Sequence, residues 1–108
     1  PYAMSYNRVT ATVEMAEVAV ALGADRARHT TEELSHIAIR EVARLFAAIG
    51  IPADLKTLGL PEDRIDWTAE SAIGIGRLIK NNPRPIDLDG MRRFLGAAHR
   101  GDLAAAAQ

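Results

Sequence analysis

Cysteine is absent from this sequence, which excludes disulfide bonds and metal sites built on thiolates. Long hydrophobic runs are absent too: no stretch reaches the roughly 18 apolar residues that a membrane-spanning helix needs. The chain does not open with the charged and apolar regions of a signal peptide. From these absences we expect a cytoplasmic protein without a membrane span.

An excess of charge of one sign is also missing. The sequence has 13 basic and 14 acidic residues and a formal net charge of -1. Nucleic-acid binders owe their affinity to a basic surface that neutralises phosphates, and no helix here has a basic face. The charge balance therefore argues against a DNA-binding helical domain.

Aromatic residues are scarce, at 5% of the sequence, although 48% of the residues are hydrophobic and many of these are alanine. Alanine favours helices but buries little surface per residue. A chain of 108 residues fits one small domain or a piece of a larger one. The thin core that this composition predicts is easier to explain if some helix faces pack on another domain or subunit.

The periodicity predicts an all-α fold of about five helices, with no strand alternation of useful length. A first helix is expected from Thr10 to Leu22, and its nearly all-apolar surface is typical of a mostly buried helix ended by Gly23. Thr30 and Glu33 have capping-box spacing and predict the start of the second helix. The apolar stripe of that helix is Leu34, Ile37, Ala38, Val42, Leu45, Phe46 and Ile49.

The second half of the sequence predicts one helical turn over residues 53–59 and then a helix start at Pro61. Asp66 is expected to cap a longer helix that runs to Leu78. The small residues of that helix, Ala69, Ala72 and Gly76, would allow a neighbouring helix to approach closely.

Asp87 is expected to cap the last helix, which would place Leu88, Met91, Phe94, Leu95 and Ala98 inward. We divide the chain into a helical segment, residues 1–101, and an alanine-rich tail, residues 102–108, that we expect to be frayed.

Two patterns that could carry chemistry are better explained structurally. Gly74-Ile75-Gly76 begins like a dinucleotide-binding fingerprint, but the third glycine is missing and the segment closes a helix instead of following a strand. We interpret these glycines as helix-packing residues. The three histidines, His29, His36 and His99, do not have the spacing of convergent metal ligands, so we expect them to be exposed or to cap helices. The sequence predicts no metal site and no catalytic residue.

The segment Asn81-Asn82-Pro83-Arg84-Pro85 cannot continue a helix, because each proline lacks an N–H donor and restricts the residue before it. Arg84 offers a planar fork of five donors, and the asparagines offer side-chain amides. Such a rigid polar connection can satisfy exposed carbonyl groups or line a pocket, and we favour the structural role.

Four segments together resemble the C-terminal part of the iron-containing (group III) alcohol dehydrogenases. Residues 76–85, Gly-Arg-Leu-Ile-Lys-Asn-Asn-Pro-Arg-Pro, resemble the end of a helix and the Asn-Pro-Arg segment that precede the family's last helix. Residues 1–8 resemble its Leu-Pro-x-Val-Met-x-Phe/Tyr-Asn motif, residues 19–23 its Ala-x-x-Leu-Gly, and residues 50–60 its Gly-Ile-Pro-x-x-Leu-x-x-Leu-Gly-Val. The resemblance runs from Pro1 to about Ala98.

The resemblance implies a larger parent enzyme that binds NAD or NADP in an N-terminal α/β domain and Fe(II), or sometimes zinc, in its helical domain. In the family the last ligand histidine precedes the proline that aligns with Pro1, so the resemblance places no metal ligand and no cofactor motif within these residues. The chain also opens without an initiator methionine or a helix start signal, and we interpret it as a piece of a longer sequence. Its expected partners are the upstream dehydrogenase domain and the subunits of a homo-oligomer.

The resemblance also gives three candidate pocket-lining residues, Leu78, Lys80 and Asn82, since this helix end approaches the substrate pocket in the family. Some members have cysteine where Leu78 stands, and a leucine would offer an apolar wall instead. Alone, these residues are expected to be non-catalytic. The alternative interpretation is a freestanding helical module for protein interaction or oligomerisation.

Overall fold

The computed structural model describes all residues from 1 to 108 and contains seven α-helices, two short 3-10 helices and no strand. The all-α prediction is therefore confirmed. The α-helices are α1 (Tyr2–Asn7), α2 (Thr12–Ala21), α3 (Thr31–Ala48), α4 (Ile65–Gly74), α5 (Gly76–Ile79), α6 (Leu88–Arg100) and α7 (Leu103–Ala106). The 3-10 helices η1 and η2 span Arg26–Arg28 and Glu62–Arg64. None of the helices combines the length and hydrophobicity that a membrane crossing requires.

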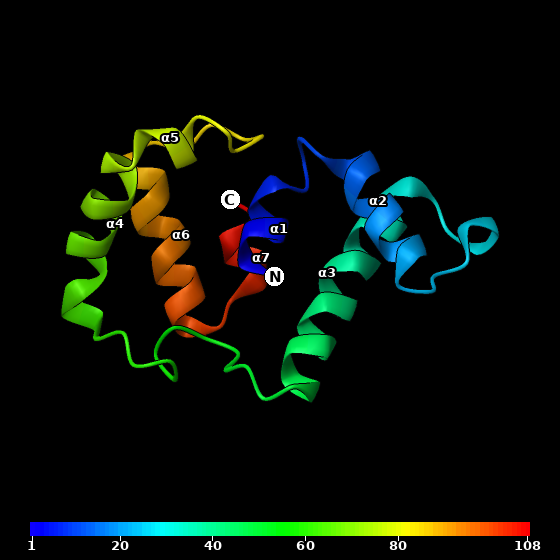
Figure 1. Ribbon diagram of the computed structural model, residues 1–108, viewed down its shortest axis with the longest axis horizontal. Coiled ribbons are helices and arrows are strands. Elements are labelled where there is room, and N and C mark those ends of the chain that lie inside the picture. Colours follow the sequence, from blue (N-terminus) through cyan, green and yellow to red (C-terminus); the bar gives the residue numbers. More distant parts are fainter.

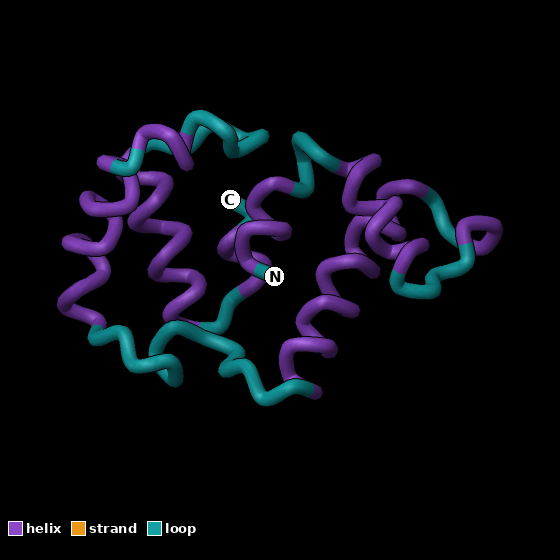
Figure 2. The backbone as a smooth tube through the Cα atoms, viewed as in Figure 1, coloured by secondary structure: helices purple, strands orange, loops and turns teal.

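The helices form two groups with α1 and α7 between them (Figure 1). The α2–α3 hairpin packs around Ala16, Ala19, Leu34 and Ala38, and α4 packs on α6 around Ala69, Met91 and Leu95. A long connection without regular helix links the end of α3 to η2 (Figure 2). Only 18 of the 108 residues are buried, so the core is thin and divided.

The helix starts and stops follow the local signals in most places. Thr30 and Glu33 form the predicted capping box at α3, and Asp87 accepts a hydrogen bond from the Gly90 N–H at 2.7 Å as the predicted cap of α6. Gly101 ends α6 with φ +76°, a left-handed conformation that disfavours other residues. The next N–H, of Asp102, bonds back to the Ala97 carbonyl at 2.9 Å.

The predicted burial of the first two helices was too high. In α2 only Ala16 and Ala19 are buried, because α3 is the helix that packs on it and covers a single face. The stripe of α3 is buried at Leu34 and Ala38 but exposed at Leu45 and Ile49, since its last turns extend beyond α2. The single helical turn predicted over residues 53–59 is present: the Leu58 N–H bonds to the Asp54 carbonyl at 3.2 Å, and Gly59 closes the turn with φ +105°.

The predicted long helix from Asp66 to Leu78 is interrupted. It begins at Ile65, so Asp66 lies in the first turn and not at the cap, and it breaks at Ile75 between α4 and α5. Ala69 packs against α6 as expected, but a Cβ added at Gly74 or Gly76 would meet no atom within 4 Å. The interpretation of these glycines as helix-packing residues is therefore wrong; they flank the break.

The chain ends also differ from expectation. Helix α1 was not predicted, since it is short and has no side-chain cap. Residues 103–106 form α7, capped by the Asp102 side chain and packed on α1 and α6, with Ala106 buried. The expectation of a frayed tail is therefore wrong. Ser5 joins the two ends by donating its hydroxyl hydrogen to the Leu103 carbonyl at 2.6 Å.

Candidate functional site

The candidate site lies where the segment Asn81–Pro85 packs against α1. Asn7 and Asn82 form a reciprocal amide pair, in which each Nδ2 donates to the other Oδ1, at 2.8 and 2.9 Å. The Asn82 amide also donates to the Arg84 carbonyl and so fixes the turn of the segment. Asn7 is buried, and this pairing satisfies polar groups that would otherwise be costly to remove from water.

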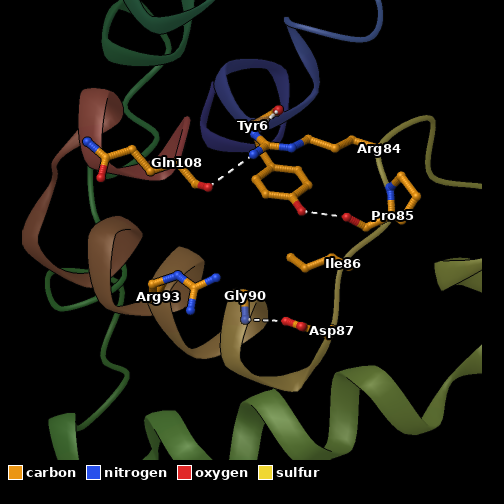
Figure 3. A pocket seen from close by; sticks show the side chains of 8 residues that line it. All are labelled: Tyr6, Arg84, Pro85, Ile86, Asp87, Gly90, Arg93 and Gln108. Atoms are coloured by element: carbon orange, nitrogen blue, oxygen red, sulfur yellow. Dashed lines mark hydrogen bonds between the residues drawn. The ribbon is translucent and has the colours of Figure 1, made fainter.

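The Arg84 guanidinium donates hydrogen bonds to main-chain oxygens. One terminal nitrogen donates to Tyr6 at 2.9 Å and to Ala107 at 2.6 Å, and the other donates to Gln108 at 3.0 Å. The guanidinium also lies over the Tyr6 ring, 4.1 Å from its centroid (Figure 3). Arg84 therefore ties α1 and the residues after α7 to the proline segment.

Tyr6 connects three parts of the site. Its hydroxyl donates to the Pro85 carbonyl at 2.7 Å, and its ring meets Phe94 of α6 edge to face, with the centroids 5.9 Å apart. Tyr6 is itself buried. The helix that the sequence did not predict thus supplies the centre of the candidate site.

A polar pocket of about 380 Å³ opens beside Tyr6, lined by Arg84, Asp87 and Arg93 among others (Figure 3). Asp87 is already engaged as the cap of α6, and Arg84 is engaged with main-chain oxygens. The polar groups of this pocket therefore serve largely to hold the fold together.

An apolar cavity of about 190 Å³ lies between α1, α5 and α6. Two of the three candidate pocket-lining residues, Leu78 and Asn82, line it, whereas Lys80 does not. Lys80 follows α5 directly, and its side chain is exposed. The structure thus brings Leu78 and Asn82 together around one cavity and leaves Lys80 at the surface.

Ionisable groups with shifted pKa values lie away from this cavity. Burial, followed by the nearby Asp54 and Asp102 carboxylates, raises the pKa of Tyr2, whose hydroxyl donates to the Ala53 carbonyl. The N–H and then the hydroxyl of Thr57 lower the pKa of the Asp54 carboxyl. These groups stabilise the loop after α3.

The histidines do not converge, and no group of three or more His, Asp or Glu side chains is arranged to hold a metal ion. His29 and His36 are exposed, as expected, and His36 lies 3.5 Å from a Glu32 oxygen. His99 departs from the expectation: it is 93% shielded, and its Nε2 is 3.0 Å from the Leu60 carbonyl oxygen. It belongs to the packing of the loop before η2 onto α6.

Sequence reasoning missed Tyr6 and Asn7 as members of the site. The Asn7 amide pairs with Asn82, 75 positions away, and the Tyr6 hydroxyl donates to Pro85, 79 positions away. No local pattern encodes such pairings. Tyr6 and Asn7 could have been predicted as site residues if the motif of residues 1–8 had been expected to pack against the segment Asn81–Pro85.

The model of the Fe-containing alcohol dehydrogenase family, C-terminal, matches residues 1–99 of this sequence. The chain belongs to this family. In this Fe-containing alcohol dehydrogenase chain, the match ends within the last turn of α6, so it includes every residue of the apolar cavity.

Three curated relatives agree with this membership. Long-chain-alcohol dehydrogenase 1 of Geobacillus thermodenitrificans is 31% identical over 95% of the chain and 26% of its own length. The 1,3-propanediol dehydrogenase of Citrobacter freundii is 33% identical over 78% of the chain and 21% of its own length. Maleylacetate reductase of Burkholderia cepacia is 32% identical over 94% of the chain and 25% of its own length.

The chain therefore spans about a quarter of the length of these relatives. No solved structure gives a significant match to it.

Proposed function

We propose that this chain is the C-terminal helical part of an NAD(P)- and metal-dependent alcohol dehydrogenase that interconverts alcohols with aldehydes or ketones. The observation that carries the proposal is the family match over residues 1–99. The relatives are two dehydrogenases that are named for alcohols and one reductase, which supports an oxidoreductase.

In this proposal the nicotinamide cofactor and the metal, Fe(II) or zinc, are bound by an upstream part of the same protein. The residues described here do not fit a metal site, because His36 lies beside Glu32 and His99 beside the Leu60 carbonyl, with no third ligand near either. The 108 residues alone are accordingly proposed to be inactive.

The proposed role of this chain is to form one wall of the substrate cleft and to hold that wall rigid. Leu78, 60% exposed at the edge of the apolar cavity, offers an apolar surface to a substrate. The Asn7–Asn82 pair and the Arg84 fork fix the segment that follows it. A catalytic site benefits from such positioning, since small displacements of a substrate-facing wall can cost much of the rate.

The remaining parts of the enzyme, and other subunits, are the proposed partners of the exposed apolar surface. Large hydrophobic side chains are exposed on α2, on the end of α3 and on α5, among them Val13, Leu45, Ile49 and Leu78. We propose that these side chains are covered by the remaining parts of the enzyme or by other subunits.

The experiment that tests the proposal compares two proteins made from the same coding sequence. The full-length protein, extended upstream of Pro1, is loaded with Fe(II) or zinc, and NAD(P)H is followed by its absorbance while a panel of alcohols is supplied. The expected result is turnover by the full-length protein and none above background by residues 1–108. Turnover by the short chain would overturn the division of labour, and an inactive, folded and metal-loaded full-length protein would overturn the enzymatic role.

A freestanding helical interaction module is the alternative, and the observation that favours it is that the chain caps and packs its own helices, α3 and α6 among them. The coding sequence decides between the two. A reading frame that begins near Pro1 would support the module, whereas one that continues upstream through a cofactor motif and a histidine cluster would support the enzyme.

A further inference from the structure

The polar pocket beside Tyr6 contains two guanidinium groups and a single carboxylate. Arg84 reaches it from the proline segment and Arg93 from α6, and the carboxylate belongs to Asp87, the cap of α6 (Figure 3). The pocket volume of about 380 Å³ lies within the range of roughly 300–1,000 Å³ that is usual for small-molecule sites. The pocket therefore has a net positive charge and room for a small anion.

Arg93 has no partner within the chain. Its guanidinium makes no ion pair and no hydrogen bond, not even with Asp87 of the same pocket. The neighbouring Arg92, by contrast, forms ion pairs at 3.0 to 3.4 Å with the carboxylates of Asp66, Glu70 and Asp89. All five N–H donors of Arg93 are therefore free to bind a ligand.

Arg84 is only partly used by the fold. Three of its five N–H hydrogens go to main-chain oxygens, which leaves the Nε hydrogen and one Nη2 hydrogen. Its positive charge lies over the Tyr6 ring and is not paired with a carboxylate. Arg84 thus offers an anion two more donors without giving up a contact that holds the fold.

Asp87 and Gly90 shape the pocket between the two arginines. The Gly90 N–H donates to Asp87 Oδ1 at 2.7 Å, and Oδ2 of the same carboxylate accepts no hydrogen bond. A Cβ added at Gly90 would lie 3.0 Å from Asp87 Oδ1 and 3.8 Å from an Nη2 of Arg93. Because this residue has no side chain, a carboxylate acceptor and a cationic donor can approach the same space.

Free guanidinium donors beside a free carboxylate oxygen distinguish among small anions. Guanidinium groups bind oxyanions through charge-assisted, paired hydrogen bonds. The carboxylate repels an oxyanion that has no hydrogen to donate, such as sulfate. Slightly above neutral pH, inorganic phosphate is a dianion that still has one hydroxyl hydrogen, whereas a phosphate monoester has lost its last one, since its second pKa is about 6.

We propose that this pocket binds the inorganic phosphate ion, with Arg84 and Arg93 donating to its oxygens and Asp87 Oδ2 accepting its hydroxyl hydrogen. The pocket is separate from the apolar cavity that Leu78 lines. The phosphate site does not rest on the proposed enzymatic function, because no alcohol, metal or nicotinamide takes part in it.

The test titrates three dianions of equal charge into the ¹⁵N-labelled chain, slightly above neutral pH and at constant ionic strength: inorganic phosphate, sulfate and methyl phosphate. The readouts are the Gly90 amide signal and the Nε–H signals of Arg84 and Arg93, with the exposed Arg77 of α5 as internal control. The expected result is a saturable shift of the pocket signals with phosphate. Sulfate and methyl phosphate should bind at least about tenfold more weakly, since each lacks one hydrogen bond to a charged group.

A matched pair of substitutions tests the donors. Arg93→Gln and Arg77→Gln make the same change in charge at an exposed helical arginine, but only Arg93 lines the pocket. Arg93→Gln is expected to weaken phosphate binding at least about tenfold, since hydrogen bonds between charged groups are lost, whereas Arg77→Gln should leave it unchanged.

Asp87→Asn tests the acceptor. Asparagine still caps a helix, but its side chain places an N–H₂ donor where the free carboxylate oxygen stood. The variant is expected to bind sulfate more tightly than the unaltered chain does, so that its preference for phosphate over sulfate falls close to one. Circular dichroism shows that each variant has kept its helices.

Three results would overturn the proposal. One is equal affinity of the unaltered chain for phosphate and sulfate, or for phosphate and methyl phosphate, or a shift that does not saturate. Another is an equal effect of Arg93→Gln and Arg77→Gln, which would mean that phosphate responds only to the overall charge. The third is an Asp87→Asn variant that keeps the full preference for phosphate. The activity of the full-length protein toward alcohols bears on none of them, so the two proposals stand or fall separately.

Discussion

At the scale of single residues, the candidate site is built from polar side chains that satisfy one another or the main chain. Asn82 donates to Asn7 and to a carbonyl, and Arg84 donates to three main-chain oxygens from two parts of the chain. Removing the partner of such a group costs free energy, because a buried polar atom without a hydrogen bond does not regain the hydration that it lost on folding. Substituting these residues should therefore lower the free energy of unfolding.

The first prediction concerns the amide pair. Asn82→Ala leaves the Asn7 amide without its partner, and we expect a loss of about 1–3 kcal/mol in the free energy of unfolding. Asn81→Ala, at the exposed neighbour, should change it by less than about 0.5 kcal/mol. Urea unfolding followed by circular dichroism measures both changes in free energy. Equal effects of the two substitutions would show that the amide pair does not stabilise the fold.

The second prediction separates the charge of Arg84 from its shape. Arg84→Lys keeps the positive charge but cannot donate to three main-chain oxygens in the same geometry. We expect faster amide hydrogen exchange in α7 and a loss of about 1–2 kcal/mol in unfolding free energy. Arg77→Lys, at an exposed arginine of α5, is the matched control and should leave α7 exchange unchanged. Unchanged hydrogen exchange in Arg84→Lys would mean that the positive charge alone is enough to hold α7 in place.

At the scale of elements, α3 shows how a local signal fixes a helix start. The N–H of Thr30 and then its hydroxyl lower the pKa of the Glu33 carboxyl, and the Glu33 N–H donates to the Thr30 hydroxyl at 3.2 Å. The cap is thus made from residues three apart and needs no distant contact. The same holds for Asp87 at α6 and Asp102 at α7.

The third prediction is that the cap of α3 weakens in acid. Because the pKa of Glu33 is lower in the folded state, its stabilising effect is complete above the unfolded value of about 4.3 and is lost as the pH falls through the folded value. Glu33→Gln can still close the capping box but does not titrate, so it should show a smaller loss of stability between about pH 5 and pH 2. Thermal unfolding across that range measures the difference, and parallel curves would contradict the prediction.

A companion pair of substitutions checks that the cap itself matters. Thr30→Ala removes the side-chain oxygen and should cost about 1 kcal/mol, whereas Thr31→Ala, one residue inside the helix and exposed, should be close to neutral.

At the scale of the whole molecule, the core is divided between the α2–α3 cluster and the α4–α6 cluster. Helix α1 joins them, since Met4 packs against the first cluster and Tyr6 contacts Phe94 beside the second. Two small cores joined by a helix of six residues should not unfold as one cooperative unit.

The fourth prediction follows from this division. Leu34→Ala and Leu95→Ala each empty a buried position in a different cluster and should each cost about 2–5 kcal/mol locally. Trp67, the single tryptophan, lies on α4 beneath the Arg64 guanidinium and reports on the second cluster. Its fluorescence midpoint in urea should move with Leu95→Ala and stay in place with Leu34→Ala. Equal movement in both variants would show a single cooperative core.

The sequence by itself determined the helical class, the capped starts of α3 and α6, and the glycine stop after α2. These features depend on residues within about five positions of one another, because the hydrogen bonds that cap a helix join residues that are close in the sequence. The family resemblance is also a property of the sequence, because it lies in short motifs kept in order.

Only the tertiary structure decided which apolar residues are covered and which residues form the site. Helix α1 is held by Leu103, Pro85 and Asn82, all more than 70 positions away, and α7 exists because α1 and α6 give it a surface to pack on. Periodicity shows that Leu45 and Ile49 share a face but not whether another element reaches it. The cavity arises in the same way, from walls that meet only when α1, α5 and α6 are brought together.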